Sequence, residues 1–185
     1  MRLLAPALAL TLTLAALPAA APAALPEGQA APDFSTGGAL AGRPFQFNLR
    51  RALRNGPVVL YFYPRSFTEG CTLEAHAFSE AAADFRRAGA QVIGLSADSY
   101  DLLRRFSVEA CRNAFPVGMA SRSIIRDYDV RFSAQRGNLT NRTSYVIAPN
   151  GRIIHAYSNL DWREHVTQTL RAVREWRAQQ RRRRG

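Results

Sequence analysis

The sequence predicts an α/β fold in which a central mixed sheet is flanked by helices and preceded by an N-terminal extension. Two observations predict it. Short, continuous apolar runs alternate with amphipathic segments, and that alternation is typical of parallel strands joined by helices. Farther along, two apolar runs are separated by an Asn-Gly dipeptide, which favours a β-hairpin.

The first strand and the first helix are predicted from contrasting patterns. Residues 58–63 read VVLYFY and are bounded by prolines; such a continuous run suits a strand buried on both faces of a sheet. In residues 72–88 the apolar side chains recur at helical spacing, and Gly89 ends the pattern. This second segment therefore predicts an amphipathic helix.

A second strand and helix follow in the same order. Residues 91–96 form another apolar run, and Ser99 is a candidate N-cap for a helix that runs toward Cys111. Residues 143–147 and 152–157 form the predicted hairpin, and an apolar stripe beginning at Trp162 predicts a closing helix. The sum, β-α-β-α-β-β-α, is the element order of the thioredoxin fold.

The N-terminal residues 1–23 have the pattern of a secretory signal peptide. Arg2 is followed by an apolar stretch, by a Pro/Ala-rich segment and by an A-x-A cleavage motif that ends at Ala23. The apolar run is short and interrupted by prolines, so we expect no stable membrane insertion, although an uncleaved anchor helix is the alternative. An exported protein is therefore expected, with the bacterial periplasm as its compartment.

The rest of the chain is predicted to be one domain, residues 24–180, with a basic tail at 181–185. The formal net charge is +11, and all 25 basic residues are arginines. They are scattered through the chain except for the cluster Arg181–Arg184. A nucleic-acid or membrane-surface role for that cluster is conceivable, but a solvated tail is the simpler interpretation, and we expect no nucleic-acid partner.

Cys71 is placed where a thiol becomes reactive. It follows a predicted strand and stands at the start of a predicted helix. Backbone N–H groups are unpaired there and the helix dipole is positive, so a thiolate is stabilised. A thiolate can attack a peroxide and become a sulfenic acid.

Pro64, Thr68 and Cys71 match the P-x-x-x-T-x-x-C signature, and through it the chain resembles the peroxiredoxins. Residues 58–78, VVLYFYPRSFTEGCTLEAHAF, and the opening Ala-Pro-Asp-Phe at 31–34 resemble the Q-type, or bacterioferritin-comigratory, branch. The resemblance runs from about Ala31 to Trp176. It implies a thioredoxin-like fold and a thiol-dependent peroxidase that reduces hydrogen peroxide and organic hydroperoxides.

The resemblance also implies roles for five residues. Cys71 matches the cysteine that attacks peroxide, Thr68 the residue whose hydroxyl orients the peroxide and hydrogen-bonds the sulfur, and Pro64 the residue that shields the thiolate. Arg142 matches the arginine that activates thiolate and peroxide, and Glu74 a glutamate that holds that arginine. Three of these residues have a simpler alternative. Thr68 could be a loop residue, Arg142 a surface charge, and Glu74 a complement to the helix dipole.

Cys111 is the candidate for resolving the sulfenic acid. Many Q-type enzymes carry a second cysteine five residues after the first, but here that position is His76, so the resolving thiol is Cys111 or comes from another molecule. At about 100° per residue, Cys111 falls outside the helix face of Leu102, Phe106 and Ala110, which predicts a thiol off the core. A passive buried thiol is the alternative.

The remaining expectations concern cofactors, partners and competing functions. The chemistry of a reactive thiol needs no metal or organic cofactor, and none is expected. The three histidines also lack the spacing of metal ligands. The implied partners are a peroxide and a thioredoxin-like dithiol reductant, and the protein is expected to be a monomer or homodimer. A thiol-disulfide oxidoreductase normally needs C-x-x-C, which the residues after Cys71 do not provide. A peroxide sensor that does not turn over also remains possible.

Overall fold

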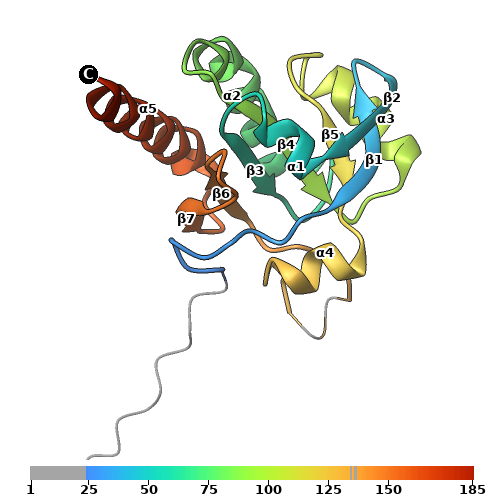
Figure 1. Ribbon diagram of the computed structural model, residues 1–185. Coiled ribbons are helices and arrows are strands. Elements are labelled where there is room, and N and C mark those ends of the chain that lie inside the picture. Colours follow the sequence, from blue (N-terminus) through green and yellow to red (C-terminus); the bar gives the residue numbers. More distant parts are fainter. Residues whose placement is uncertain (1–23, 134, 136) are drawn as a thin grey trace, which may run out of the picture.

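One mixed sheet organises the chain. The computed structural model describes residues 24–133, 135 and 137–185, so the predicted signal peptide at 1–23 lies outside the described residues. Within these residues, seven strands form a single sheet in the order β2-β1-β5-β4-β3-β6-β7 (Figure 1). The predicted fold class, a mixed sheet flanked by helices, is confirmed.

The neighbouring strands β3, β4 and β5 pair in parallel, and all other pairs are antiparallel. The strands are β1 (Ser35–Leu40), β2 (Arg43–Asn48), β3 (Val58–Phe62), β4 (Gln91–Ser96), β5 (Val117–Met119), β6 (Thr143–Ile147) and β7 (Ile153–Ser158). The helices are α1 (Leu49–Leu53), α2 (Glu69–Arg87), α3 (Tyr100–Glu109), α4 (Arg122–Asp127) and α5 (His165–Arg184).

Strand β3 lies in the interior of the sheet, between parallel β4 and antiparallel β6. All five of its residues are buried. Val59 and Tyr61 contribute to the core on one face of the sheet, and Leu60 and Phe62 contribute to the core on the other. Burial on both faces explains why this segment is apolar without alternation.

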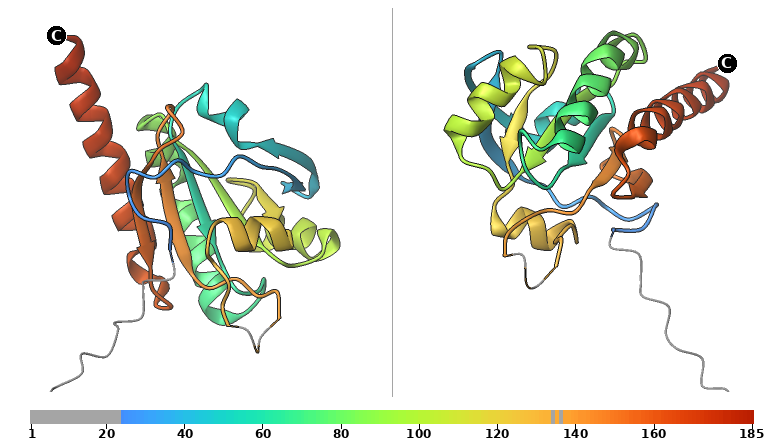
Figure 2. Two further views of the ribbon diagram at one scale, coloured as in Figure 1. Left: turned by 60° about the horizontal axis from the view of Figure 1, so that its bottom comes forward. Right: turned by 180° about the vertical axis from the view of Figure 1, so that it is seen from behind.

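Helices cover both faces of the sheet. Helices α2, α3 and α5 pack on one face, and α1 and α4 pack on the other. Figure 2 shows α5 and α4 on opposite sides of the strands, and in Figure 1 the C-terminal end of α5 projects away from the sheet. Among the helices of the described residues, none is both long enough and apolar enough to cross a membrane.

Most predicted elements are confirmed, with shifted ends. Residues 91–96 form β4, and the strands on either side of the Asn-Gly turn pair as the hairpin β6–β7. Helix α2 begins at Glu69 instead of Thr72. The closing helix starts as a 3₁₀ turn at Trp162–Glu164, and α5 then continues through Arg184.

The sequence does not predict the hairpin β1–β2, because Gly37 and Gly38 lie inside its first strand and glycine is depleted in strands. Gly38 lies inside β1 and pairs with Gly118 of β5. A Cβ atom on Gly38 would lie 1.9 Å from the backbone oxygen of Val117. Glycine is therefore required for the close approach of the two strands.

This approach predicts that Gly38→Ala destabilises the fold. The added methyl group must push β1 away from β5, and such overpacking is expected to lower the free energy of unfolding by about 3 kcal/mol. Chemical denaturation measures the change. Gly37→Ala in the same strand is the matched control, because the nearest atom there belongs to the flexible side chain of Gln46, at 3.3 Å. Equal stability of the two variants would contradict the prediction.

Candidate active site

Cys71 lies in the first turn of α2, just beyond the end of β3. The first helical hydrogen bond runs from Thr72 N to Thr68 O, at 2.9 Å. Cys71 is only 1% exposed, so its sulfur is nearly withdrawn from bulk water. The N-terminal end of the helix offers backbone N–H groups and a positive dipole to a negative sulfur.

The loop between β3 and α2 is fixed by polar contacts at both ends. Thr140 donates a hydrogen bond to Tyr63 O at 2.6 Å, and Ser66 N donates to the Asp98 carboxylate at 2.7 Å. Phe67 has a φ of 64°, a left-handed conformation that is uncommon outside glycine. These contacts hold the loop in a conformation that presents Thr68 at the start of α2.

Arg142 connects Cys71 with Glu74 and the loop after β7. Its Nη2 donates to the Cys71 sulfur at 3.5 Å, its Nη1 pairs with the Glu74 carboxylate, and its Nε donates to Leu160 O at 2.9 Å. Phe62 and Thr143 are register partners of the antiparallel β3–β6 pair. Arg142, just before β6, therefore stands at the sheet edge where β3 ends.

The Glu74–Arg142 pair is deeply buried: the Glu74 side chain is fully inaccessible and that of Arg142 is 7% exposed. Burial raises the pKa of Glu74, and the guanidinium of Arg142 opposes that rise. Burial by itself would lower the pKa of Arg142, but Glu74 and Cys71 outweigh it and the pKa is raised. Arg142 therefore stays a cation beside the sulfur.

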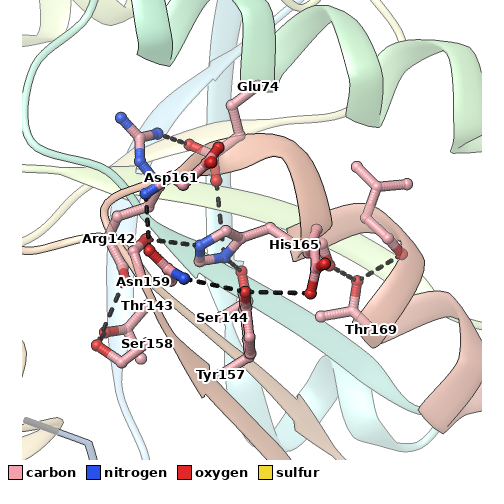
Figure 3. Close-up of polar contacts among 12 residues, drawn as sticks. Glu74, Arg142, Thr143, Ser144, Tyr157, Ser158, Asn159, Asp161, His165 and Thr169 are labelled. Carbon is pink, nitrogen blue, oxygen red and sulfur yellow. Dashed lines mark hydrogen bonds and ion pairs between the residues drawn. The ribbon is translucent and has the colours of Figure 1, made fainter.

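His165 belongs to the same polar network, although it is not among the site residues predicted from the sequence. Its Nδ1 lies 2.8 Å from Ser144 Oγ and 3.8 Å from Glu74 Oε1, and its Nε2 lies 2.9 Å from Asn159 O (Figure 3). Burial lowers the pKa of His165 to about 4, so the imidazole is neutral near pH 7. The available signal was a histidine beside the apolar stripe of the closing helix.

Thr68 and Pro64 belong to the segment between β3 and α2. Thr68 is the N-cap residue of α2, and its hydroxyl donates to Arg65 O at 3.0 Å. Its side chain is exposed and Pro64 is half-buried. The structure thus brings Cys71, Glu74 and Arg142 into direct contact, while the proposed roles of Thr68 and Pro64 toward a peroxide stay predictions.

No metal site accompanies these residues. In the part of the chain that the structure describes, no three His, Cys, Asp or Glu side chains gather so that they could hold a metal ion. The Cys71 sulfur instead accepts a hydrogen bond from an arginine. This arrangement suits an anionic sulfur and the charge that develops when it reacts.

Comparison with known proteins identifies the family. The model of the AhpC/TSA family matches residues 27–156. The chain belongs to this family of peroxiredoxins. Chloroplastic peroxiredoxin Q of Sedum lineare is 32% identical over 136 residues, which cover 71% of this chain and 69% of the relative. Family and fold together support a thiol-dependent peroxidase, an oxidoreductase.

Solved structures agree with this assignment. The peroxidoxin BcpB of Mycobacterium tuberculosis is 28% identical, with a TM-score of 0.70, over 80% of this chain and 96% of that one. The bacterioferritin comigratory protein of Xanthomonas campestris is 27% identical, with a TM-score of 0.67, over 76% and 91%. This peroxiredoxin is therefore similar to the Q-type branch in both sequence and fold.

The prediction that Cys111 lies off the core is wrong. Helix α3 ends at Glu109, and Cys111 is 0% exposed in the same core cluster as Cys71. The helical angle no longer applies beyond the helix end, where Arg112 and Asn113 turn the backbone through left-handed conformations. Burial raises the pKa of the Cys111 thiol.

The contact between Arg142 and the sulfur predicts that Arg142→Ala slows oxidation of Cys71 by hydrogen peroxide by about 10²-fold, as when one preorganised donor is lost. The second-order rate constant is measured by competition with a reference peroxidase. Arg86→Ala is the matched control, because Arg86 is an exposed arginine of α2, the helix that carries Cys71. This variant is expected to be oxidised at the normal rate. An unchanged rate for Arg142→Ala would show that Arg142 stabilises the fold but does not contribute to the oxidation of Cys71.

Proposed function

We propose that this peroxiredoxin reduces hydrogen peroxide and organic hydroperoxides by attack of the Cys71 thiolate on the O–O bond. The sulfur bonds to one peroxide oxygen, the O–O bond breaks, and the other oxygen leaves with the electron pair and is protonated to water or an alcohol. Cys71 becomes a sulfenic acid. The observation that carries the proposal is the contact of Arg142 with the Cys71 sulfur at the start of α2.

Arg142 contributes most where negative charge develops. The guanidinium is fixed by Glu74 and by Leu160 O before any peroxide arrives, so little reorganisation is needed during the reaction. The substrate class includes organic hydroperoxides because the bacterioferritin comigratory protein of Xanthomonas campestris has been studied for alkyl peroxide reduction. No cofactor enters this step.

We further propose that Cys111 resolves the sulfenic acid. The Cys111 thiol gives up its proton, its sulfur attacks the Cys71 sulfur to form an S–S bond, and the hydroxyl group takes up a proton and leaves as water. Both cysteines are free in the described part of the chain, and both belong to the core on one face of the sheet. The burial of Cys111 keeps it a thiol until the surrounding segment opens.

The segment after α3 is suited to such opening. Two successive residues, Arg112 and Asn113, have φ angles of 51° and 60°, and non-glycine residues in this region store about 1–3 kcal/mol each. Both side chains are exposed, so unwinding of this turn costs mainly the burial of Cys111 and the hydrogen bond from Asn113 N to Ser107 O. A disulfide needs Cα atoms within about 7 Å, and this movement would bring Cys111 toward Cys71.

A thioredoxin-like dithiol protein is the proposed reductant. It would reduce the Cys71–Cys111 disulfide by thiol–disulfide exchange and return both thiols. If residues 1–23 act as a signal peptide, this reductant works outside the cytoplasm, with the bacterial periplasm as the proposed compartment. Either a monomer or a homodimer is compatible with this cycle.

The cycle predicts distinct behaviour for the two cysteine variants in a time course of peroxide loss with thioredoxin as the reductant. The wild type is expected to consume peroxide in proportion to the dithiol supplied, and Cys71→Ser to consume none. Cys111→Ser is expected to stall at the sulfenic acid or to be over-oxidised. Peptide mapping of the oxidised wild type should find an intramolecular Cys71–Cys111 disulfide.

Other outcomes would point elsewhere. Turnover by Cys71→Ser would exclude Cys71 as the reactive thiol. Normal turnover by Cys111→Ser, or only intermolecular bridges in the wild type, would indicate a one-cysteine peroxidase. A single round of oxidation despite excess dithiol would identify a sensor.

The signal peptide makes a separate prediction. The protein recovered from its host is expected outside the cytoplasm, with a mature N-terminus at Ala24, because the A-x-A motif ends at Ala23. N-terminal sequencing of fractionated cells measures both properties. A cytoplasmic protein that retains Arg2 would contradict export and remove the reason for an exported reductant.

A further inference from the structure

The loop between β7 and α5 holds Arg142 at two points. The side-chain Nε of Arg142 donates to Leu160 O at 2.9 Å, and the backbone N–H of Asn159 donates to Arg142 O at 3.1 Å. The position of this loop therefore determines where the guanidinium lies.

The His165 ring supports the same loop from the interior. Its side chain is fully buried. Because the carbonyl of Asn159 can only accept a hydrogen bond, the proton of the neutral ring is on Nε2, which donates across 2.9 Å. Nδ1 then accepts from the Ser144 hydroxyl, 2.8 Å away. Figure 3 shows the ring between the Asn159 backbone, Ser144 and Glu74.

We propose that His165 is a positioning residue for Arg142: its Nε2 tethers the loop at Asn159, so that Leu160 O aims the guanidinium at the Cys71 sulfur. The inference deepens the proposed function and rests on it. His165 does not touch the sulfur in this arrangement and acts only through the loop and Arg142.

The planar guanidinium explains why this tether matters. Nε is bound to Leu160 O and Nη1 to Glu74, which leaves Nη2 directed at Cys71. Two fixed acceptors on one rigid plane set the third direction. If Leu160 O moves, the plane can turn about the remaining contact with Glu74, and a shift of about 1 Å can cost as much as 10²-fold in rate.

Three variants of His165 separate its two hydrogen bonds. In His165→Gln the amide nitrogen occupies the place of Nε2 and can still donate to Asn159 O. In His165→Asn the shorter amide reaches only the Nδ1 position, beside Ser144, and His165→Leu makes neither bond. We expect Gln to retain the rate of Cys71 oxidation within about 3-fold, and Asn and Leu to lose about 10-fold or more.

Two controls distinguish positioning from general destabilisation. Thr169→Val removes a buried hydroxyl that bonds His165 O at 2.6 Å, so it perturbs the same helix turn but spares the ring contacts; its oxidation rate is expected to be normal. In an Arg142→Ala background, His165→Leu should cause no further slowing, because coupled residues are not additive. The proposal would be overturned if the losses of oxidation rate were additive in the double variant. It would also be overturned if His165→Gln and His165→Leu lost the same rate, or if only His165→Asn retained it.

A second readout keeps this inference separable from the proposed function. The rate of Cys71 alkylation by iodoacetamide, followed against pH in a Cys111→Ser background, reports the thiolate without any peroxide. The alkylation profiles of the variants are expected to follow the same order as their oxidation rates. The profile of His165→Gln should lie near that of the unsubstituted protein, and the profiles of His165→Asn and His165→Leu should be shifted along the pH axis. If Cys71 fails to react with peroxide but alkylation keeps this order, the proposed function fails and the positioning role stands. Identical alkylation profiles would reject the positioning role.

Discussion

The buried contact between Glu74 and Arg142 is the constraint on which the rest of the site depends. It joins α2 to the residue just before β6, and both side chains lie almost entirely out of water. Removing either partner would leave the other buried without its main contact, which is costly in a low-dielectric interior. Because the pair is formed before substrate arrives, the Nη2 group of the guanidinium is available to the sulfur of Cys71.

The sequence predicted those parts of the fold that burial alone determines. Strands β3 and β4 are buried on both faces, so their segments are continuous apolar runs, and the Asn-Gly turn between β6 and β7 has its own local chemistry. The β1–β2 hairpin could not be found in this way. Gly38 weakens the strand pattern but is required by the closeness of Val117 in β5, a contact that only the assembled sheet reveals.

The site shows the same division between local and tertiary signals. Cys71 is predicted from its place at a helix start and from the family motif, Glu74 and Arg142 only from the family resemblance, and the structure brings the three together. The role of His165 does not follow from the sequence, because its partners come from a strand, a helix and a loop that only the fold brings together. The burial of Cys111 differs from the sequence prediction because helical geometry does not continue past Glu109, where α3 ends and the backbone turns.

The antiparallel pairing of β3 with β6 has a consequence for how this site can vary. Phe62, the last residue of β3, pairs with Thr143, the first residue of β6, so the loop that leads to Cys71 starts on the ladder opposite the point where Arg142 enters β6. The loop after β3 and the first turn of α2 complete the placement of Cys71, and the rest of the connection then passes through β4, α3, β5 and α4 before it reaches Arg142. Changes in the length of the exposed connections can therefore accumulate while the separation between the sulfur and the guanidinium is conserved.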